Sequence, residues 1–196
     1  SIFEDGSGKM TVSRGKVHKY LGMTLDYTIR GQVQITMFDY IEEILTAFDK
    51  ADPKAGGTKS SAAPENLFCI DEDCEKLQTD KAVEFHNLVA KTLYTCTAVA
   101  FLTTRVRAPN NEDWKKLVHM MKYIRGTKSL PLILSADESS ILKWWVDASF
   151  AVHPNMRGHS GGGLSLGRGF PIVSSTKQKL NTRRLRDERG CSDRLD

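Results

Sequence analysis

Apolar and polar residues alternate in short runs at the start of the chain and then change to a helical spacing. The alternating runs at residues 9–13, 17–27 and 32–36 predict strands, because successive side chains of a strand point to opposite faces. Arg14-Gly15 and Arg30-Gly31 separate the runs, and glycine can supply the turns. A helix is predicted from about residue 37 to residue 49, and Thr36 with Asp39 resembles a capping box at its start.

The middle of the chain is predicted to be a linker followed by a long helix. Residues 51–66 are rich in Pro, Gly, Ser and Lys without an apolar period, so residues 51–78 are expected to form a linker. No Pro or Gly interrupts the helical pattern at residues 79–107, which predicts one nearly continuous helix or a helix with a single kink near residues 95–97.

A further helix is predicted at residues 112–125, ended by Gly126 in a left-handed cap. Its buried stripe would consist of Trp114, Leu117, Val118, Met121 and Ile124. On the opposite side, four residues would face solvent: Lys115, Lys116, His119 and Lys122.

Strands dominate the pattern after residue 129. Runs at residues 141–149, 161–165 and 170–177 predict an antiparallel meander, and a weaker strand is expected at residues 130–135. The period of two puts Trp145 and Asp147 on one face, with Trp144, Val146 and Ala148 on the other. The whole pattern predicts an α+β fold.

Composition narrows the class of protein. With 196 residues and 40% hydrophobic residues, the chain can build one ordinary core. No apolar run approaches the roughly 20 residues of a membrane span, and residues 1–5 lack the pattern of a secretory signal. We therefore expect an intracellular protein without a membrane partner, and the first residue, Ser1, suggests a piece of a longer chain. The four cysteines fit neither a zinc site nor a disulfide framework and are expected to be free thiols, with His153 and His159 as loop residues.

Positive charge gathers in the second half of the chain. The net charge is +4, acidic residues gather between residues 65 and 84, and basic residues concentrate after residue 105. The candidate contacts to a nucleic-acid backbone are Arg105, Arg107, Lys115, Lys116, Lys122, Lys177, Lys179 and Arg183. Such a set can follow a duplex or can simply be a solvated face, and the sequence leaves both interpretations open.

Four motifs in order resemble a known family. Residues 144–149 (WWVDAS), 158–167 (GHSGGGLSLG) and 171–179 (PIVSSTKQK) resemble the opening of RNase H in copia-type retrotransposon polyproteins. Upstream, residues 20–23 (YLGM), 40–45 (YIEEIL) and 114–127 resemble the end of the preceding reverse transcriptase. The resemblance implies a palm-edge hairpin and helix at residues 1–50, thumb- or connection-like helices at residues 79–128 and the first RNase H strands at residues 129–183, followed by an atypical tail at residues 184–196. It also implies that a deletion near residues 93–99 fused two helices into one.

The polymerase chemistry of this family lies outside the chain. Two metal-holding carboxylates come from a Tyr-x-Asp-Asp turn, and the sequence contains no adjacent Asp pair. What remains is Tyr20, Leu21, Gly22 and Met23, which resemble the hairpin that positions the primer terminus. Gly22 suits close approach to a ligand strand, and an ordinary hairpin glycine is the equally good alternative.

The nuclease chemistry is represented by one residue. RNase H needs four carboxylates around two Mg²⁺ ions, and Asp147 matches the first of them. Relatives carry the second glutamate where this chain has Arg189, with Asp187 and Glu188 as its only acidic neighbours. The glycines of residues 158–169 lack the Lys-Ser/Thr that a phosphate loop needs and fit a packed hairpin better.

The sequence therefore predicts a fragment of a reverse transcriptase and RNase H that is catalytically silent, with Mg²⁺ as the cofactor of the ancestral enzyme and no stably bound metal here. The expected partners are an RNA:DNA hybrid or a DNA duplex, bound weakly, and the remainder of a polyprotein. Two alternatives stay open: a domesticated nucleic-acid-binding module and a gene product without function.

Overall fold

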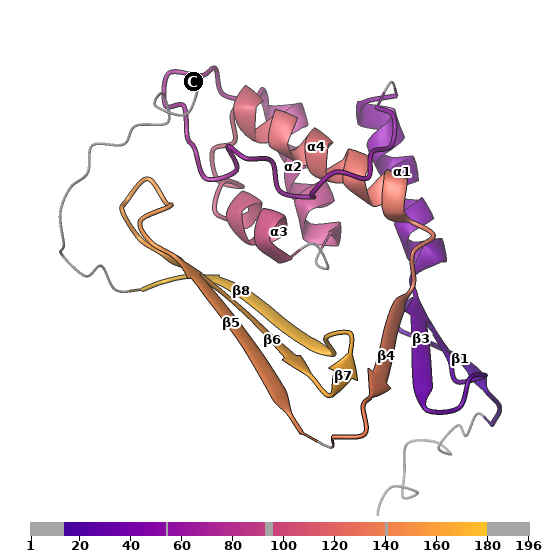
Figure 1. The fold of residues 1–196 in the computed structure, drawn as a ribbon. Coiled ribbons are helices and arrows are strands. Elements are labelled where there is room, and N and C mark those ends of the chain that lie inside the picture. Colours follow the sequence, from indigo (N-terminus) through magenta and orange to yellow (C-terminus); the bar gives the residue numbers. More distant parts are fainter. Residues whose placement is uncertain (1–13, 54, 93–95, 140, 180–196) are drawn as a thin grey trace, which may run out of the picture.

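The fold combines four helices with two antiparallel sheets in the parts of the chain that the computed structural model describes, residues 14–53, 55–92, 96–139 and 141–179 (Figure 1). The elements in chain order are β1 (Val17–Tyr20), β2 (Met23–Asp26), β3 (Gln32–Thr36), α1 (Phe38–Ala51), α2 (Thr79–Lys91), α3 (Cys96–Thr103), α4 (Asn111–Thr127), β4 (Leu132–Ala136), β5 (Lys143–Ser149), β6 (His159–Ser165), β7 (Gly167–Arg168) and β8 (Ile172–Lys177). The predicted α+β class is confirmed at this level.

The smaller sheet has the strand order β5-β6-β8, with both pairs antiparallel. The predicted meander is therefore confirmed, although the short strand β7 lies between β6 and β8 in the sequence. Trp145 pairs with Gly163 and Asp147 pairs with Gly161, so Trp145 and Asp147 share a face as predicted. We call this three-stranded unit the small sheet.

The larger sheet joins both ends of the described chain, in the order β1-β2-β3-β4-β7. Val33 of β3 pairs with Leu134 of β4, and Ser135 pairs with Arg168 of β7. The strand expected at residues 130–135 thus pairs with the first hairpin. The run at residues 17–27 forms two strands with a tight turn between them, and the strand expected at residues 9–13 lies outside the described residues.

In the described part of the chain, residues 79–107 form two separate helices, α2 and α3, so the prediction of one nearly continuous helix was wrong. Residues 93–95, beside the predicted kink, lie outside the described residues. α2 ends at Lys91, where Thr92 leaves the helical conformation and its hydroxyl donates to the carbonyl oxygens of Leu88 and Val89, both at 3.1 Å. These bonds satisfy carbonyls that a helix end would leave unpaired. α3 is a separate helix, so α2 can bury Phe85 while α3 buries Phe101 in the same core.

Two helix termini also differ from the predictions. Met37 occupies the N-cap position of α1, and no side chain caps that helix. The capping box predicted at Thr36 is absent because Thr36 is the last residue of β3. A capping box is found instead at α4, where the Asp113 N–H donates to Asn110 Oδ1 and the Asn110 N–H donates to Asp113 Oδ2.

Gly126 lies within α4 and does not end it, because the helix continues to Thr127 and Gly126 has no positive φ. The segment expected to be a linker crosses the helix at this point. The Thr58 N–H donates to the Lys122 carbonyl at 2.9 Å, and a Cβ at position 126 would lie 1.9 Å from the Thr58 carbonyl oxygen. Close backbone packing therefore requires the glycine.

The hydrophobic core lies among the four helices and the segment that crosses α4. Its fully buried members include Ile44, Phe48, Leu67, Phe85, Phe101, Leu102, Leu117, Met120 and Met121. Figure 1 shows the helices as one layer, with α3 above β8 of the small sheet and α1 above the larger sheet. Within the described residues, no helix has the length and apolar character needed to cross a bilayer.

Candidate nucleic-acid interface

Asp147 lies in the middle of β5 on the helix-facing side of the small sheet. This face is set by the strand register, since Asp147, Gly161 and Ser175 stand opposite one another and Ser175 contacts α3 through Thr97. Asp147 is nevertheless exposed, because α3 covers β8 and leaves β5 open. The central residue of the RNase H resemblance is thus presented at the surface of a strand.

A shallow hollow of about 380 Å³ surrounds Asp147. It is also lined by Gly161, Gly162, Gly163, Trp145, Val146, Phe170 and Val173. The Phe170 ring lies against Gly163 so closely that a Cβ there would be 2.7 Å from the ring carbon Cδ1. Exposed aromatic rings such as those of Trp145 and Phe170 can stack with a planar base.

The residues lining this hollow do not fit a two-metal centre. Asp147 is the only carboxylate among them, and one carboxylate leaves Mg²⁺ with most of its waters. Among the residues that the structure describes, no three His, Cys, Asp or Glu side chains lie together as a metal site. Asp187, Glu188 and Arg189 of the tail lie outside that part of the chain.

Two basic residues, Lys177 and Arg157, lie near each other at the far end of the small sheet. Lys177 of β8 stands opposite His159, which in turn stands opposite Ser149 of β5. Burial and then the nearby Arg157 charge lower the pKa of Lys177. Lys179 follows two residues later and is exposed. We call Arg157, Lys177 and Lys179 the basic end of the small sheet.

No sequence motif marks Arg157 as part of this group. It lies in the loop between β5 and β6, and only the pairing of β6 with β8 brings that loop beside Lys177. Two like charges near each other attract an anion, because a shared counter-ion removes their repulsion. The basic end is therefore suited to a phosphate group.

The other basic candidates are not gathered into one surface. Arg105 makes an ion pair with Asp113, with Nε 3.0 Å from Oδ2, and Lys115 pairs with Glu112 at 2.5 Å. Arg107 is exposed and Lys122 is half-buried. Arg183 lies outside the described residues.

Lys116 is buried, so its predicted exposure was wrong. Its ammonium group donates to the Cys69 carbonyl oxygen and lies 5.0 Å from the centre of the Phe101 ring. Desolvation by burial lowers its pKa. The reason for the difference is the segment around residue 69, which covers this side of α4 and supplies the partner. Lys116 is thus unavailable to a nucleic-acid backbone.

The hairpin of Tyr20, Leu21, Gly22 and Met23 connects β1 and β2. Leu21 and Gly22 both have positive φ, 48° and 77°, as a tight two-residue turn requires. Leu21 is 77% exposed, and a Cβ on Gly22 would come no closer than 3.7 Å to Tyr40. The turn conformation alone accounts for the glycine, while Tyr20 and Leu21 remain open to a partner.

His153 lies in the loop between β5 and β6 as predicted, whereas His159 is the first residue of β6, so the prediction was wrong for His159; both side chains are buried. His153 Nε2 lies 3.1 Å from His159 Nδ1, and His159 Nε2 lies 2.7 Å from Ser175 Oγ. Ser175 Oγ donates to Thr97 Oγ1 of α3 at 3.1 Å. This hydrogen-bonded chain fastens the small sheet to the helices, under the ring of Phe68.

Burial lowers the pKa of both histidines. Desolvation, followed by the charges of Lys177 and His159, lowers the pKa of His153 to about 4. Desolvation alone lowers the pKa of His159. The pair is therefore neutral near pH 7, and one ring N–H is shared between the two imidazoles.

The cysteines also differ in part from the expectation of free thiols. Cys74 is free, whereas Cys69 is disulfide-bonded. Cysteine spacing along the chain does not reveal a partner that folding brings near, so this bond could not be predicted from the sequence.

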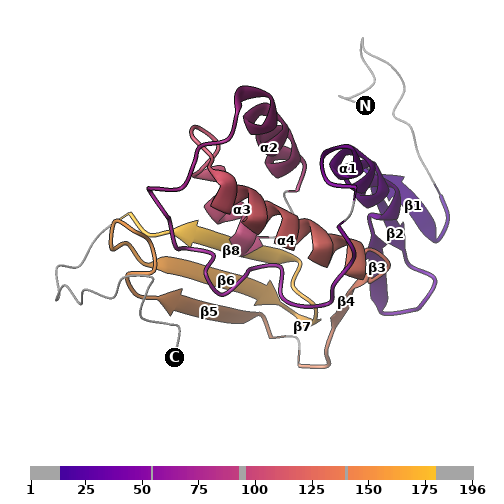
Figure 2. The ribbon, with the colours of Figure 1, turned by 90° about the horizontal axis from the view of Figure 1, so that it is seen from above.

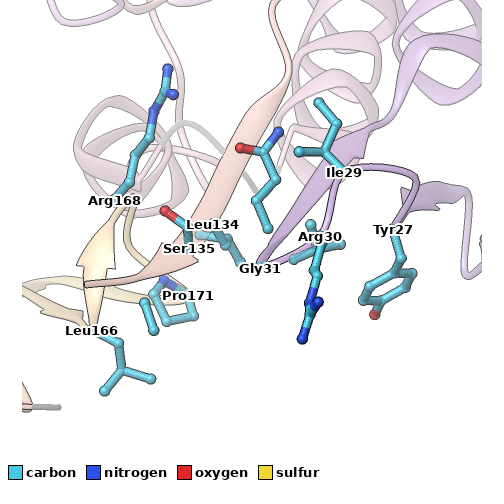
Figure 3. A pocket seen from close by; sticks show the side chains of 12 residues that line it. Tyr27, Ile29, Arg30, Gly31, Leu134, Ser135, Leu166, Arg168 and Pro171 are labelled. Carbon is cyan, nitrogen blue, oxygen red and sulfur yellow. The ribbon is translucent and has the colours of Figure 1, made fainter. Parts of the chain in front are cut away.

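A second hollow, of about 430 Å³, lies between β3, β4 and β7 (Figure 3). It is lined mainly by apolar groups, among them Ile29, Val33 and Leu134. Arg30 and Arg168 are at its rim, and Figure 3 shows their side chains extending in opposite directions. They therefore do not form a clamp for one anion.

Comparison with known proteins gives no relative for this chain: no family model, no curated protein and no solved structure matches it.

Proposed function

We propose that the chain is a nucleic-acid-binding derivative of a copia-type reverse transcriptase and RNase H that neither extends nor cuts nucleic acid. The observation that carries the proposal is the helix-facing side of the small sheet. It combines Asp147 in the middle of the first strand, exposed aromatic rings and a basic end. The RNase H resemblance of the sequence accounts for the first of these features, and the basic end accounts for retained binding.

The spacing of these features suits a nucleic-acid strand. Trp145 and Ser149 are four residues apart along β5, which corresponds to roughly 13 Å in a strand. Since Ser149 aligns with Lys177 across the sheet, a nucleic-acid strand held at the basic end can extend along β5 toward Trp145 and Phe170. Phosphate contacts supply affinity without sequence preference, and stacking adds a contact that tolerates any base.

Loss of catalysis follows from charge and ligand number. The nuclease transition state needs two metal ions held by several carboxylates, and the hollow supplies Asp147 alone. The nearby cations of the basic end favour the phosphate and oppose a second divalent metal. Binding is thus retained by the groups that remain, while cleavage has lost the groups that it needs.

The test is binding and cleavage of one labelled RNA:DNA hybrid. We expect binding whose affinity falls about 40-fold between about 50 and 200 mM salt, if three phosphate contacts each contribute about 0.9 to the log–log slope. We expect no cleavage with Mg²⁺ or Mn²⁺ and no primer extension.

The control is Asp147→Asn, which removes the carboxylate and leaves the side-chain size nearly unchanged. Unchanged hybrid binding and equally absent cleavage in this variant support the proposal. Cleavage by the wild-type chain that disappears in Asp147→Asn would show that other carboxylates complete a nuclease site. Absence of salt-dependent binding would leave the chain without the proposed function.

A further inference from the structure

β5 is an edge strand with an unusual surface. Among the strands that the structure describes, it pairs with β6 alone, and Figure 2 shows it as the outermost strand of the small sheet. Trp144, Trp145 and Val146 are 66%, 59% and 78% exposed. A long, apolar edge strand presents unpaired N–H and C=O groups to another strand, and natural proteins usually protect such an edge.

The sequence of β5 is complementary to itself in one antiparallel register. When two copies pair about Trp145, Lys143 of each stands opposite Asp147 of the other. In the same register Trp144 stands opposite Val146, and Trp145 stands opposite its own copy. Opposite charges and aromatic or β-branched pairs are the cross-strand contacts that stabilise a sheet.

The faces of the strand agree with this register. Lys143, Trp145 and Asp147 lie on the helix-facing side, so the two ion pairs flank the tryptophan pair. Trp144 and Val146 meet on the other side. Moving the centre by one residue in either direction separates Lys143 from Asp147, so charge selects a single alignment.

We propose that two copies of this chain associate by antiparallel pairing of their β5 strands, centred on Trp145. Two three-stranded sheets would become one continuous sheet, with the free edge of β5 removed from both copies. Lys143, which already contacts Asp137 of its own chain, gains Asp147 of the second copy as a further partner. The pairing uses Trp145 and Asp147, which also lie on the proposed nucleic-acid face, so it is tested without nucleic acid.

The test is the dissociation constant of the dimer, measured by sedimentation of the full chain without nucleic acid. We expect a concentration-dependent equilibrium between monomer and dimer. Asp147→Lys places lysine opposite lysine at two symmetric positions and should raise the dissociation constant at least about tenfold. The charge swap Lys143→Asp with Asp147→Lys restores opposite charges and should return it to within about threefold of the wild-type value.

A second arm keeps the test decisive if the charge swap fails to fold. Lys143→Asp and Asp147→Lys, each self-repelling, should form a mixed dimer when combined, and circular dichroism shows whether each is folded. A wild-type chain that stays monomeric, an Asp147→Lys variant that dimerises as the wild type does, or open-ended aggregates in place of dimers would each overturn the proposal.

Discussion

Replacing Gly126 with alanine should destabilise the chain by about 3 kcal/mol, the upper part of the range for overpacking a well-filled site. The new Cβ would lie 1.9 Å from the Thr58 carbonyl oxygen and 2.8 Å from the Thr58 nitrogen. Both are backbone atoms, so no side chain can rotate away. Relief requires the segment to move off α4, which breaks the hydrogen bond from Thr58 to Lys122.

The sign of this effect is informative because helix propensity alone predicts the opposite. Alanine in a helix interior is favoured over glycine by about 1 kcal/mol. Gly56→Ala is the matched control, since a Cβ there meets no heavy atom within 4 Å. Urea unfolding of the three proteins separates the effects. A Gly126→Ala variant as stable as the wild type would show that the segment does not cross α4 at this point.

Acid should weaken the fold through the buried histidine pair. The pKa of His153 is lowered to about 4 by burial and then by the charges of Lys177 and His159, whereas an unfolded chain has a value near 6.5. Between these values the unfolded chain binds a proton that the folded chain does not. Stability is therefore complete above about pH 6.5, falls as the pH is lowered and levels off below about pH 4. Solvent screening reduces the effect, so about 3 kcal/mol is the upper limit of the expected loss.

The measurement is the free energy of unfolding in urea at several values between pH 7 and pH 4. Carboxylates also titrate in this range, so His153→Gln serves as the reference, with a neutral polar side chain in place of the imidazole. We expect the wild type to lose more stability on acidification than this variant does. Parallel pH profiles would contradict a neutral, buried His153.

The spacing of apolar residues was sufficient to predict those helices and strands whose buried face depends only on their own sequence. The alternation in residues 141–149 was sufficient to place Asp147 and Trp145 on one face, since the period of a strand fixes this directly. The positions of α1 and α4 follow similarly from apolar residues at three and four. None of these depends on which distant segment completes the core.

The differences arise where tertiary contacts outweigh local pattern. Gly126 looks like a helix stop, yet a crossing backbone needs the same residue within a helix. Lys116 has a solvent-facing pattern, yet the Cys69 carbonyl and the Phe101 ring cover it. At the end of α2, the Thr92 hydroxyl donates to the carbonyl oxygens of Leu88 and Val89, a bond that any helical threonine can make.

The sequence predicted the position of Asp147 in the candidate site, but not the residues that surround the small sheet. Asp147 is recognisable from its strand and the glycines that follow. Arg157 joins the site only through the register of β6 with β8, and the histidine pair is linked to α3 through Ser175 and Thr97. Pairing between separate segments is not encoded in any short stretch of sequence.

The most direct test of the account is whether the basic end of the small sheet holds the nucleic-acid backbone. Fluorescence anisotropy of a labelled hybrid gives the slope of log affinity against log salt. Lys177→Gln with Lys179→Gln should flatten this slope by about 1.8, from two phosphate contacts at about 0.9 each. Lys50→Gln with Lys59→Gln removes the same charge from two exposed lysines elsewhere and should leave the slope unchanged. Equal slopes for the two double variants would contradict binding at the basic end.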